Sequence, residues 1–173
     1  DEICYEDLIQ EEDVIVTVTR KGYIKRMKKD TYKSQRRGGR GLKGSDMADD
    51  DFFTNIFMAN THTDLLFCTD KGNIFTLKVY SLPEGSRTNK GRNAANLIRI
   101  PSGERIKDII AVPDDREGKF LVFATQSGIV KRTALTEFKK VKQSGLRAIK
   151  IVEGDTLLGL RVSNGDKDVL LCS

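Results

Sequence analysis

Three segments of the chain share one order of apolar and polar positions. They are DVIVTVTRKGYIKR from Asp13, DLLFCTDKGNIFTL from Asp64 and KFLVFATQSGIVKR from Lys119. Each begins with a short apolar run, passes through a polar link that ends in glycine, and resumes as a second strand that turns basic or polar. This pattern is typical of a β-hairpin, in which the glycine supplies the positive φ of a tight turn.

The hairpins recur at a regular interval. Their turn glycines, Gly22, Gly72 and Gly128, lie 50 and 56 residues apart, and a second glycine beside a cation follows each of them after 17 to 19 residues. A further pair of apolar strands comes next. A repeat of this length with about four strands predicts a blade of a radially repeated β fold. An array of small β domains is the alternative, but units of this size without disulfides or metals bury little apolar surface.

We therefore predict an all-β chain in which residues 1–173 form one partial domain. The predicted blades span residues 13–61, 62–112 and 117–163, and residues 166–173 open the next blade. Three blades and one strand do not close a ring, so the expected arrangement is an open arc. Its open blade edges predict self-association.

Charge is distributed unevenly along the chain. The segment from Arg20 to Gly44 contains eleven Lys or Arg and one acid, a local charge of +10, so the remainder sums to −5 within a net charge of +5. The first thirteen residues carry seven acids, and Asp46 to Asp51 form a second acidic cluster. A field of this kind indicates a polyanionic partner.

The cysteines and the lengths of the apolar runs indicate where the protein is located. The three cysteines, Cys4, Cys68 and Cys172, are expected to be reduced core residues of a cytosolic protein. No signal peptide is evident, and no apolar run approaches the roughly 20 residues that span a bilayer. The chain begins without an initiator Met, so we expect it to be a piece of a longer protein.

The sequence contains no pattern typical of a catalytic site, a metal site or a nucleotide-binding loop. The single histidine, His62, lies in ANTHTD, where a solvated loop residue is expected, and there is no C-x-x-C pair. Gly39, Gly41 and Gly44 match G-x-G-x-x-G, but a basic stretch precedes them and an acidic one follows, instead of the strand and helix of a dinucleotide site. A P-loop would need Lys where Ser45 stands. No cofactor or metal is predicted.

The stretch SQRRGGRGLKG predicts contact with duplex DNA. Arginine forks pair phosphate oxygens, glycines admit the backbone to a surface that a Cβ would keep away, and neutralised phosphates release counterions. Similar cations recur after the other hairpins, and few aromatics are interleaved, which favours sequence-independent duplex binding over single strands. The predicted contacts are Gln35, Arg36, Arg37, Gly38, Gly39, Arg40, Gly41, Lys43, Lys25, Arg26, Arg87, Lys90, Arg92, Lys131, Arg132, Lys139, Lys140, Lys142 and Arg147.

The residues from Gln35 to Gly41, QRRGGRG, resemble the box Q-R-R-G-G-[KR]-G that marks the C-terminal domain of the DNA gyrase A subunit. The flanking EDVIVTVTRKGYIKR and the repeated hairpins agree with it along the whole chain. The resemblance implies a β-pinwheel whose blades exchange strands, and it implies that the box connects the first and last blades. It also implies that duplex DNA wraps around the rim of the domain.

The same resemblance implies partners and location. The wrapped DNA would be presented to the strand-passage gate of an A₂B₂ complex with the gyrase B subunit, which uses ATP to introduce negative supercoils in the bacterial cytoplasm, at the nucleoid. The family's catalytic tyrosine and its ATP and Mg sites lie elsewhere, so this piece is expected to be non-catalytic and free of cofactors. The equivalent domain of topoisomerase IV, whose box is degenerate, is the nearest alternative. A propeller used as a protein-interaction scaffold, the alternative from another class, leaves the +10 segment unexplained.

Overall fold

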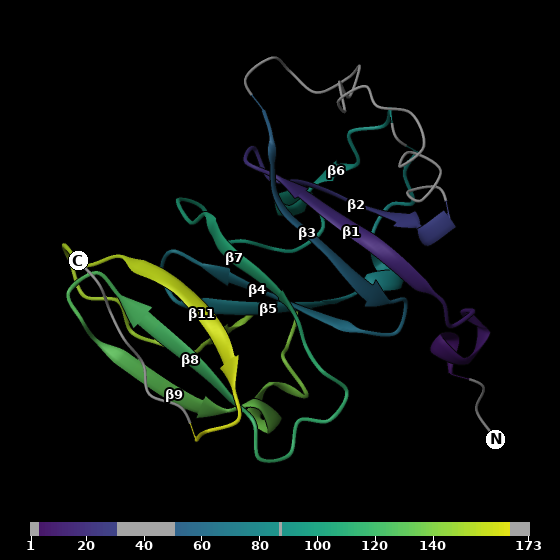
Figure 1. Cartoon of the computed structure of the whole chain (residues 1–173). Coiled ribbons are helices and arrows are strands. Elements are labelled where there is room, and N and C mark those ends of the chain that lie inside the picture. The colour runs from purple at the N-terminus through teal and green to yellow at the C-terminus, as the bar shows by residue number, and fades with distance from the viewer. Residues whose placement is uncertain (1–3, 31–50, 87, 167–173) are drawn as a thin grey trace. The chain divides into compact units, whose positions relative to one another are not determined.

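The computed structural model describes residues 4–30, 51–86 and 88–166, and its regular secondary structure is mainly antiparallel β-strand (Figure 1). Among the described residues, Lys29 and Asp30 are α-helical, and the other helical segments are single 3₁₀ turns. They are η1 (Tyr5–Leu8), η2 (Val79–Ser81), η3 (Ala94–Asn96) and η4 (Leu135–Phe138). The predicted all-β class is confirmed.

The chain forms two compact units that interleave in sequence. Unit 1 consists of Asp1–Thr63 and Lys78–Leu97, and unit 2 consists of Asp64–Leu77 and Ile98–Ser173. Each unit holds its own sheets.

Unit 1 contains one four-stranded sheet in the order β3-β1-β2-β6. Figure 1 shows β2, β1 and β3 side by side, with the short β6 beyond β2. The first three strands come from one repeat, whereas β6 follows the second hairpin in the sequence. The sheet is thus completed by a strand from the next repeat. The bounds are β1 (Asp13–Thr19), β2 (Tyr23–Lys28), β3 (Phe53–Asn60) and β6 (Arg92–Asn93).

Unit 2 contains two sheets, in the orders β10-β5-β4-β7 and β11-β8-β9. The first repeats the exchange seen in unit 1, because β10 comes from the third repeat and pairs with β5 of the second. Strand exchange between repeats, which the resemblance implied, is therefore a feature of this fold. The bounds are β4 (Asp64–Thr69), β5 (Asn73–Lys78), β7 (Ile106–Ala111), β8 (Phe120–Thr125), β9 (Val130–Ala134), β10 (Leu146–Arg147) and β11 (Leu157–Ser163).

The three hairpin turns use the same two residues. Gly22, Gly72 and Gly128 have φ of 87°, 81° and 88°, which confirms the predicted turn geometry. Three residues before each glycine stands a buried threonine, at positions 19, 69 and 125. Its carbonyl accepts the glycine N–H at 2.9–3.0 Å, and its hydroxyl accepts the next N–H at 3.1–3.2 Å. The turn is therefore closed by T-x-x-G rather than by glycine alone.

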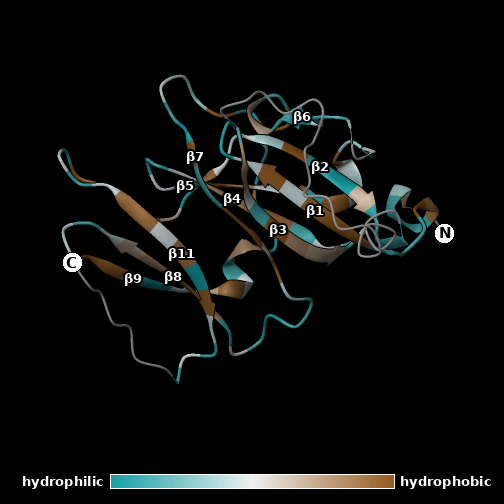
Figure 2. Cartoon of the chain, turned by 45° about the horizontal axis from the view of Figure 1, so that its top comes forward, coloured by the Kyte–Doolittle hydropathy of each residue, from teal (hydrophilic) through white to brown (hydrophobic). Residues whose placement is uncertain are grey.

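Apolar strands form the cores of both units. The β-branched run of β1 is buried at six of its seven positions, a continuous pattern typical of a strand covered on both faces. In unit 2 the sheets share one buried cluster that includes Leu66, Phe123, Phe138 and Leu160. Figure 2 shows the hydrophobic colour concentrated on the strands and the hydrophilic colour on the connecting loops.

Two expectations about single residues are wrong. Cys4 is exposed instead of lying in the core, while Cys68 is fully buried as expected, and Cys172 lies outside the described residues. Burial, aided by the charge of Asp108, raises the pKa of the Cys68 thiol to about 12, so this thiol stays protonated and unreactive. His62 lies in a turn as expected but is partly buried instead of solvated, because its Nε2 lies 2.9 Å from the carbonyl oxygen of Ile9.

Candidate nucleic-acid interface

The densest part of the predicted site lies outside the described residues. This applies to the whole box from Gln35 to Gly41, to Lys43 and to Arg87. The remaining predicted residues fall on two segments in unit 1 and on three in unit 2, and they differ in what their charged groups contact.

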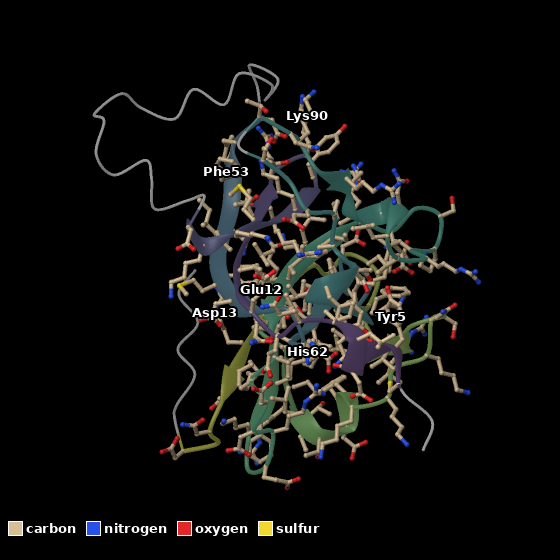
Figure 3. The ribbon with its side chains drawn as sticks, turned by 90° about the vertical axis from the view of Figure 1, so that its right-hand side faces the viewer. Tyr5, Glu12, Asp13, Phe53, His62 and Lys90 are labelled. Carbon is tan, nitrogen blue, oxygen red and sulfur yellow. The ribbon has the colours of Figure 1, made fainter. Side chains whose placement is uncertain are left out.

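In unit 1, Arg92 in the exchanged strand β6 and Lys90 in the loop before it are exposed to solvent. Arg92 pairs with Ile24 of β2, and Lys90 projects from the adjoining loop at the far end of unit 1 from His62 (Figure 3). The Lys90 ammonium lies 6.0 Å from the centroid of the Tyr23 ring, a distance at which the ring face attracts a cation. Both charges therefore lie on the segment that completes the sheet.

The path of this segment depends on Gly91. Its φ is +80°, and a Cβ built on it would lie 2.3 Å from the carbonyl oxygen of Ile24. The Gly91 N–H donates to the Asn89 side chain at 2.6 Å. Glycine thus allows the backbone of the basic segment to lie directly against β2.

Lys25 and Arg26 differ from the rest of the predicted set. Lys25 is 4% exposed, and its ammonium donates to the carbonyls of Ser86 at 2.8 Å and Asn89 at 2.6 Å. Burial lowers its pKa. Arg26 donates from Nε to the Leu82 carbonyl at 3.1 Å. These two side chains are directed at the polypeptide of unit 1 itself.

Unit 2 repeats the arrangement of the exchanged strand. Arg147 lies exposed in β10 opposite Asn73 of β5. The preceding Gly145 has φ +82°, and its Cβ would lie 2.7 Å from the Phe75 ring. Lys140 and Lys142 are exposed on the approach to this strand. An exposed arginine thus follows the close-packed glycine in both exchanged strands.

The other predicted DNA contacts in unit 2 interact with groups of the protein itself. The Lys139 ammonium lies 3.6 Å from a Glu117 carboxylate oxygen, in a pair with both side chains largely exposed. Lys131 donates to the Ala148 carbonyl at 2.7 Å, and the Arg132 guanidinium lies 4.3 Å from the centroid of the Phe120 ring. Stacking on the ring restricts the arginine without neutralising it.

Sequence reasoning missed the groups that orient these cations. The Tyr23 ring lies beside Lys90 and the Phe120 ring beside Arg132, yet the strand pattern offered no reason to connect an aromatic residue with a cation elsewhere in the sequence.

Sequence reasoning also missed an acidic residue that holds a hairpin turn. The Asp155 carboxylate accepts from the Ser127 hydroxyl and from its N–H at 2.9 Å, and these hydrogen bonds, the hydroxyl first, lower the Asp155 pKa to about 2.

Comparison with known proteins places these features in a family. A family described as "DNA gyrase C-terminal domain, beta-propeller" matches residues 13–60, 63–113 and 119–164. The chain belongs to this family. The matched segments cover the three hairpin repeats and both described exchanged strands.

Relatives of this gyrase-type domain agree with the assignment. The chain is 44% identical over 170 residues to the DNA gyrase A subunit of Clostridium acetobutylicum, covering 98% of this chain and 20% of the relative. It is 45% identical over 166 residues to the DNA gyrase A subunit of Halalkalibacterium halodurans, covering 96% and 20%. The chain therefore spans about a fifth of the length of these relatives.

Solved structures show the same fold. The C-terminal domain of DNA topoisomerase IV is 31% identical with a TM-score of 0.75, covering 91% of this chain and 47% of that chain. A DNA gyrase A C-terminal domain is 28% identical with a TM-score of 0.66, covering 88% and 48%. Within the described residues of the gyrase-type chain, no helix has the length and apolar character to cross a membrane.

Proposed function

We propose that the chain binds duplex DNA through its phosphates, largely independently of sequence, and bends it as the wrapping domain of a DNA gyrase A subunit. The observation that carries the proposal is that each exchanged strand has an exposed arginine close to a tightly packed glycine, Arg92 one residue after Gly91 and Arg147 two residues after Gly145. Exposed cations on the exchanged strand of each repeat suit a line of phosphates. Smooth bending of 20–30 base pairs costs on the order of 1–6 kcal/mol, which several such contacts can offset.

Membership of the family supports a wider role. Within a longer gyrase polypeptide, the bound segment is delivered to a strand-passage gate formed with the gyrase B subunit in an A₂B₂ complex, and ATP-dependent passage introduces negative supercoils. We propose that the chain acts without a catalytic residue, cofactor or metal of its own, and that ATP and Mg act elsewhere in that complex. It works in the bacterial cytoplasm on the chromosome. The box residues from Gln35 to Gly41 anchor the wrapped DNA.

The test compares two arginines of unit 2 over a salt series. Arg147→Ala removes an exposed charge on the exchanged strand, whereas Arg161→Ala removes one from β11, where the guanidinium lies 3.1 Å from Asp108. Each lost phosphate contact lowers the slope of log affinity against log salt by about 0.9. We expect this decrease for Arg147→Ala and no change for Arg161→Ala. Equal slopes in the two variants, or salt-insensitive binding in the parent chain, would contradict the proposal and favour a protein-interaction scaffold.

Topoisomerase IV supplies a second candidate, because its solved C-terminal domain gives the higher TM-score of the two, 0.75 against 0.66. Wrapping itself can be measured. Relaxation of a circular plasmid by a type I topoisomerase in the presence of the chain should leave a linking-number shift if DNA is wrapped. A triple variant, Arg36→Ala with Arg37→Ala and Arg40→Ala, should lose the shift. Binding without any shift in the parent chain would contradict the proposed wrapping.

A further inference from the structure

We infer that Lys25 is a positioning residue that holds the basic segment of unit 1 in place, and that it does not contact nucleic acid itself. The basic segment is defined here as Ser86 and residues 88–92, which include Lys90 and Arg92. The inference rests on the proposed function, because it assigns the orientation of a DNA-contacting segment to a residue outside it.

The Lys25 side chain is enclosed by this segment. Only 4% of the residue is exposed, and its ammonium donates to the Ser86 and Asn89 carbonyls at 2.8 and 2.6 Å. These acceptors flank the part of the loop that leads to Lys90. The ammonium therefore holds two points of the same loop at once. Hydrogen bonds from a charged donor are stronger than those between neutral groups, so these two contacts restrain the loop effectively.

The backbone at Gly85 and Gly91 lies close to the Lys25 side chain. A Cβ on Gly85 would lie 2.7 Å from Lys25 Cδ, and a Cβ on Gly91 would lie 2.9 Å from Lys25 Cβ. On the adjacent residue, the Arg26 N–H donates to the Pro83 carbonyl at 3.0 Å, and the Gly85 N–H donates to the Arg26 carbonyl at 2.9 Å. Gly85 and the basic segment therefore both lie in close contact with the lysine stem.

The second repeat shows what this position requires for packing alone. Phe75, three residues after its turn glycine as Lys25 is after Gly22, is 2% exposed, and its ring packs against Gly145. An apolar side chain can thus occupy the position. Burial of an ammonium costs free energy and lowers the pKa of Lys25. Packing alone therefore does not explain a lysine at this position. Its contacts indicate that the ammonium holds the Ser86 and Asn89 carbonyls.

The experiment uses the full chain with Lys25→Met, which keeps an apolar stem of similar length and removes the two hydrogen bonds. Amide hydrogen exchange of the free protein is measured first, at Gly85 and Gly91. Affinity for linear duplex over a salt series follows, for Lys25→Met, for Lys90→Ala and for the double variant. Lys28→Met is the matched control, because Lys28 lies on the same strand and is exposed.

We expect faster exchange at Gly91 in Lys25→Met and not in Lys28→Met. The salt slope should fall by about 0.9 to 1.8, corresponding to the loss of Lys90 and Arg92 as phosphate contacts. The Lys25→Met and Lys90→Ala effects should be strongly non-additive, because a role through Lys90 leaves nothing for the second change to remove. Additive effects would mean a general structural role and would overturn the inference.

The failures of the two proposals can be told apart. Unchanged exchange at Gly85 and Gly91 in Lys25→Met overturns the positioning role even if the parent chain binds DNA. If exchange accelerates but the parent chain shows no salt-dependent binding, the proposed function fails and the role of Lys25 in DNA binding fails with it. A circular dichroism spectrum that matches the parent chain shows that Lys25→Met is folded, and Gly85→Val, which forces a side chain against Lys25 Cδ, gives an independent displacement of the same segment.

Discussion

Replacement of Gly91 by alanine tests whether strand exchange holds unit 1 together. The matched control is Gly22→Ala in the same unit. Both glycines have positive φ, at +80° and +87°, but a Cβ on Gly22 would meet nothing closer than the Asn93 side chain at 3.7 Å. A Cβ on Gly91 would lie 2.3 Å from the Ile24 carbonyl oxygen, which belongs to the backbone and cannot rotate away.

The two variants should differ in their free energy of unfolding. A non-glycine residue in the left-handed region costs about 1–2 kcal/mol, and this applies to both. At Gly91 the clash must also displace β6 from β2, and overpacking of this kind adds about 1–3 kcal/mol. We therefore expect a loss of about 1–2 kcal/mol for Gly22→Ala and about 2–5 kcal/mol for Gly91→Ala.

The assay can report on unit 1 alone. The chain has no Trp, and its four tyrosines, Tyr5, Tyr23, Tyr32 and Tyr80, all fall within the sequence ranges of unit 1. Urea unfolding followed by tyrosine fluorescence therefore gives the midpoint and slope for this unit. Equal midpoints in the two variants would refute the reasoning, because they would show that β6 can move away from β2 at no cost.

Three further changes have defined outcomes. Thr69→Val leaves the Asn73 N–H without its hydroxyl acceptor and should destabilise unit 2 by about 1–3 kcal/mol in urea unfolding, whereas Thr69→Ser should lose much less. Asp155→Asn should lower the free energy of unfolding at neutral pH. The pKa of Asp155 in the folded protein, about 2, lies below the ordinary value of 3.8, so the stabilisation by the ionised carboxylate is present above pH 4 and is lost as pH falls toward 2. The unfolding curves of parent and variant should coincide at that pH. Phe120→Leu removes the ring under Arg132 and should weaken duplex binding while the salt slope stays constant, since no charge is lost; a changed slope would contradict this.

The sequence predicted the repeated hairpins well because their signal is local. A short apolar run, a turn glycine and a second strand are decided by neighbouring residues, and Gly22, Gly72 and Gly128 have the positive φ that the pattern requires. The role of the threonine three positions earlier was equally local, in TRKG, TDKG and TQSG, but glycine alone explained the turn and the threonine was overlooked.

The candidate site was predicted less completely because charge does not reveal what a side chain contacts. Lys25 and Arg92 are both basic residues within three positions of a glycine, yet Lys25 is buried against carbonyls and Arg92 is exposed. The difference arises from the pairing of β6 with β2, a contact between residues about 70 positions apart in sequence. No periodicity within either strand encodes that contact.

Strand exchange gives the basic residues a second role. Arg92 and Arg147 lie in the same short strands that complete the sheets of units 1 and 2, so whatever holds these strands also holds the cations. Thermodynamic linkage then requires the reverse effect. A duplex that binds Arg92 and Lys90 only when β6 is paired must stabilise the pairing, by RT ln(1 + [L]/Kd), which amounts to about 2.7 kcal/mol at one hundred times Kd. Saturating duplex should therefore slow amide exchange in β2 opposite β6, and it should partly restore the stability that Gly91→Ala removes.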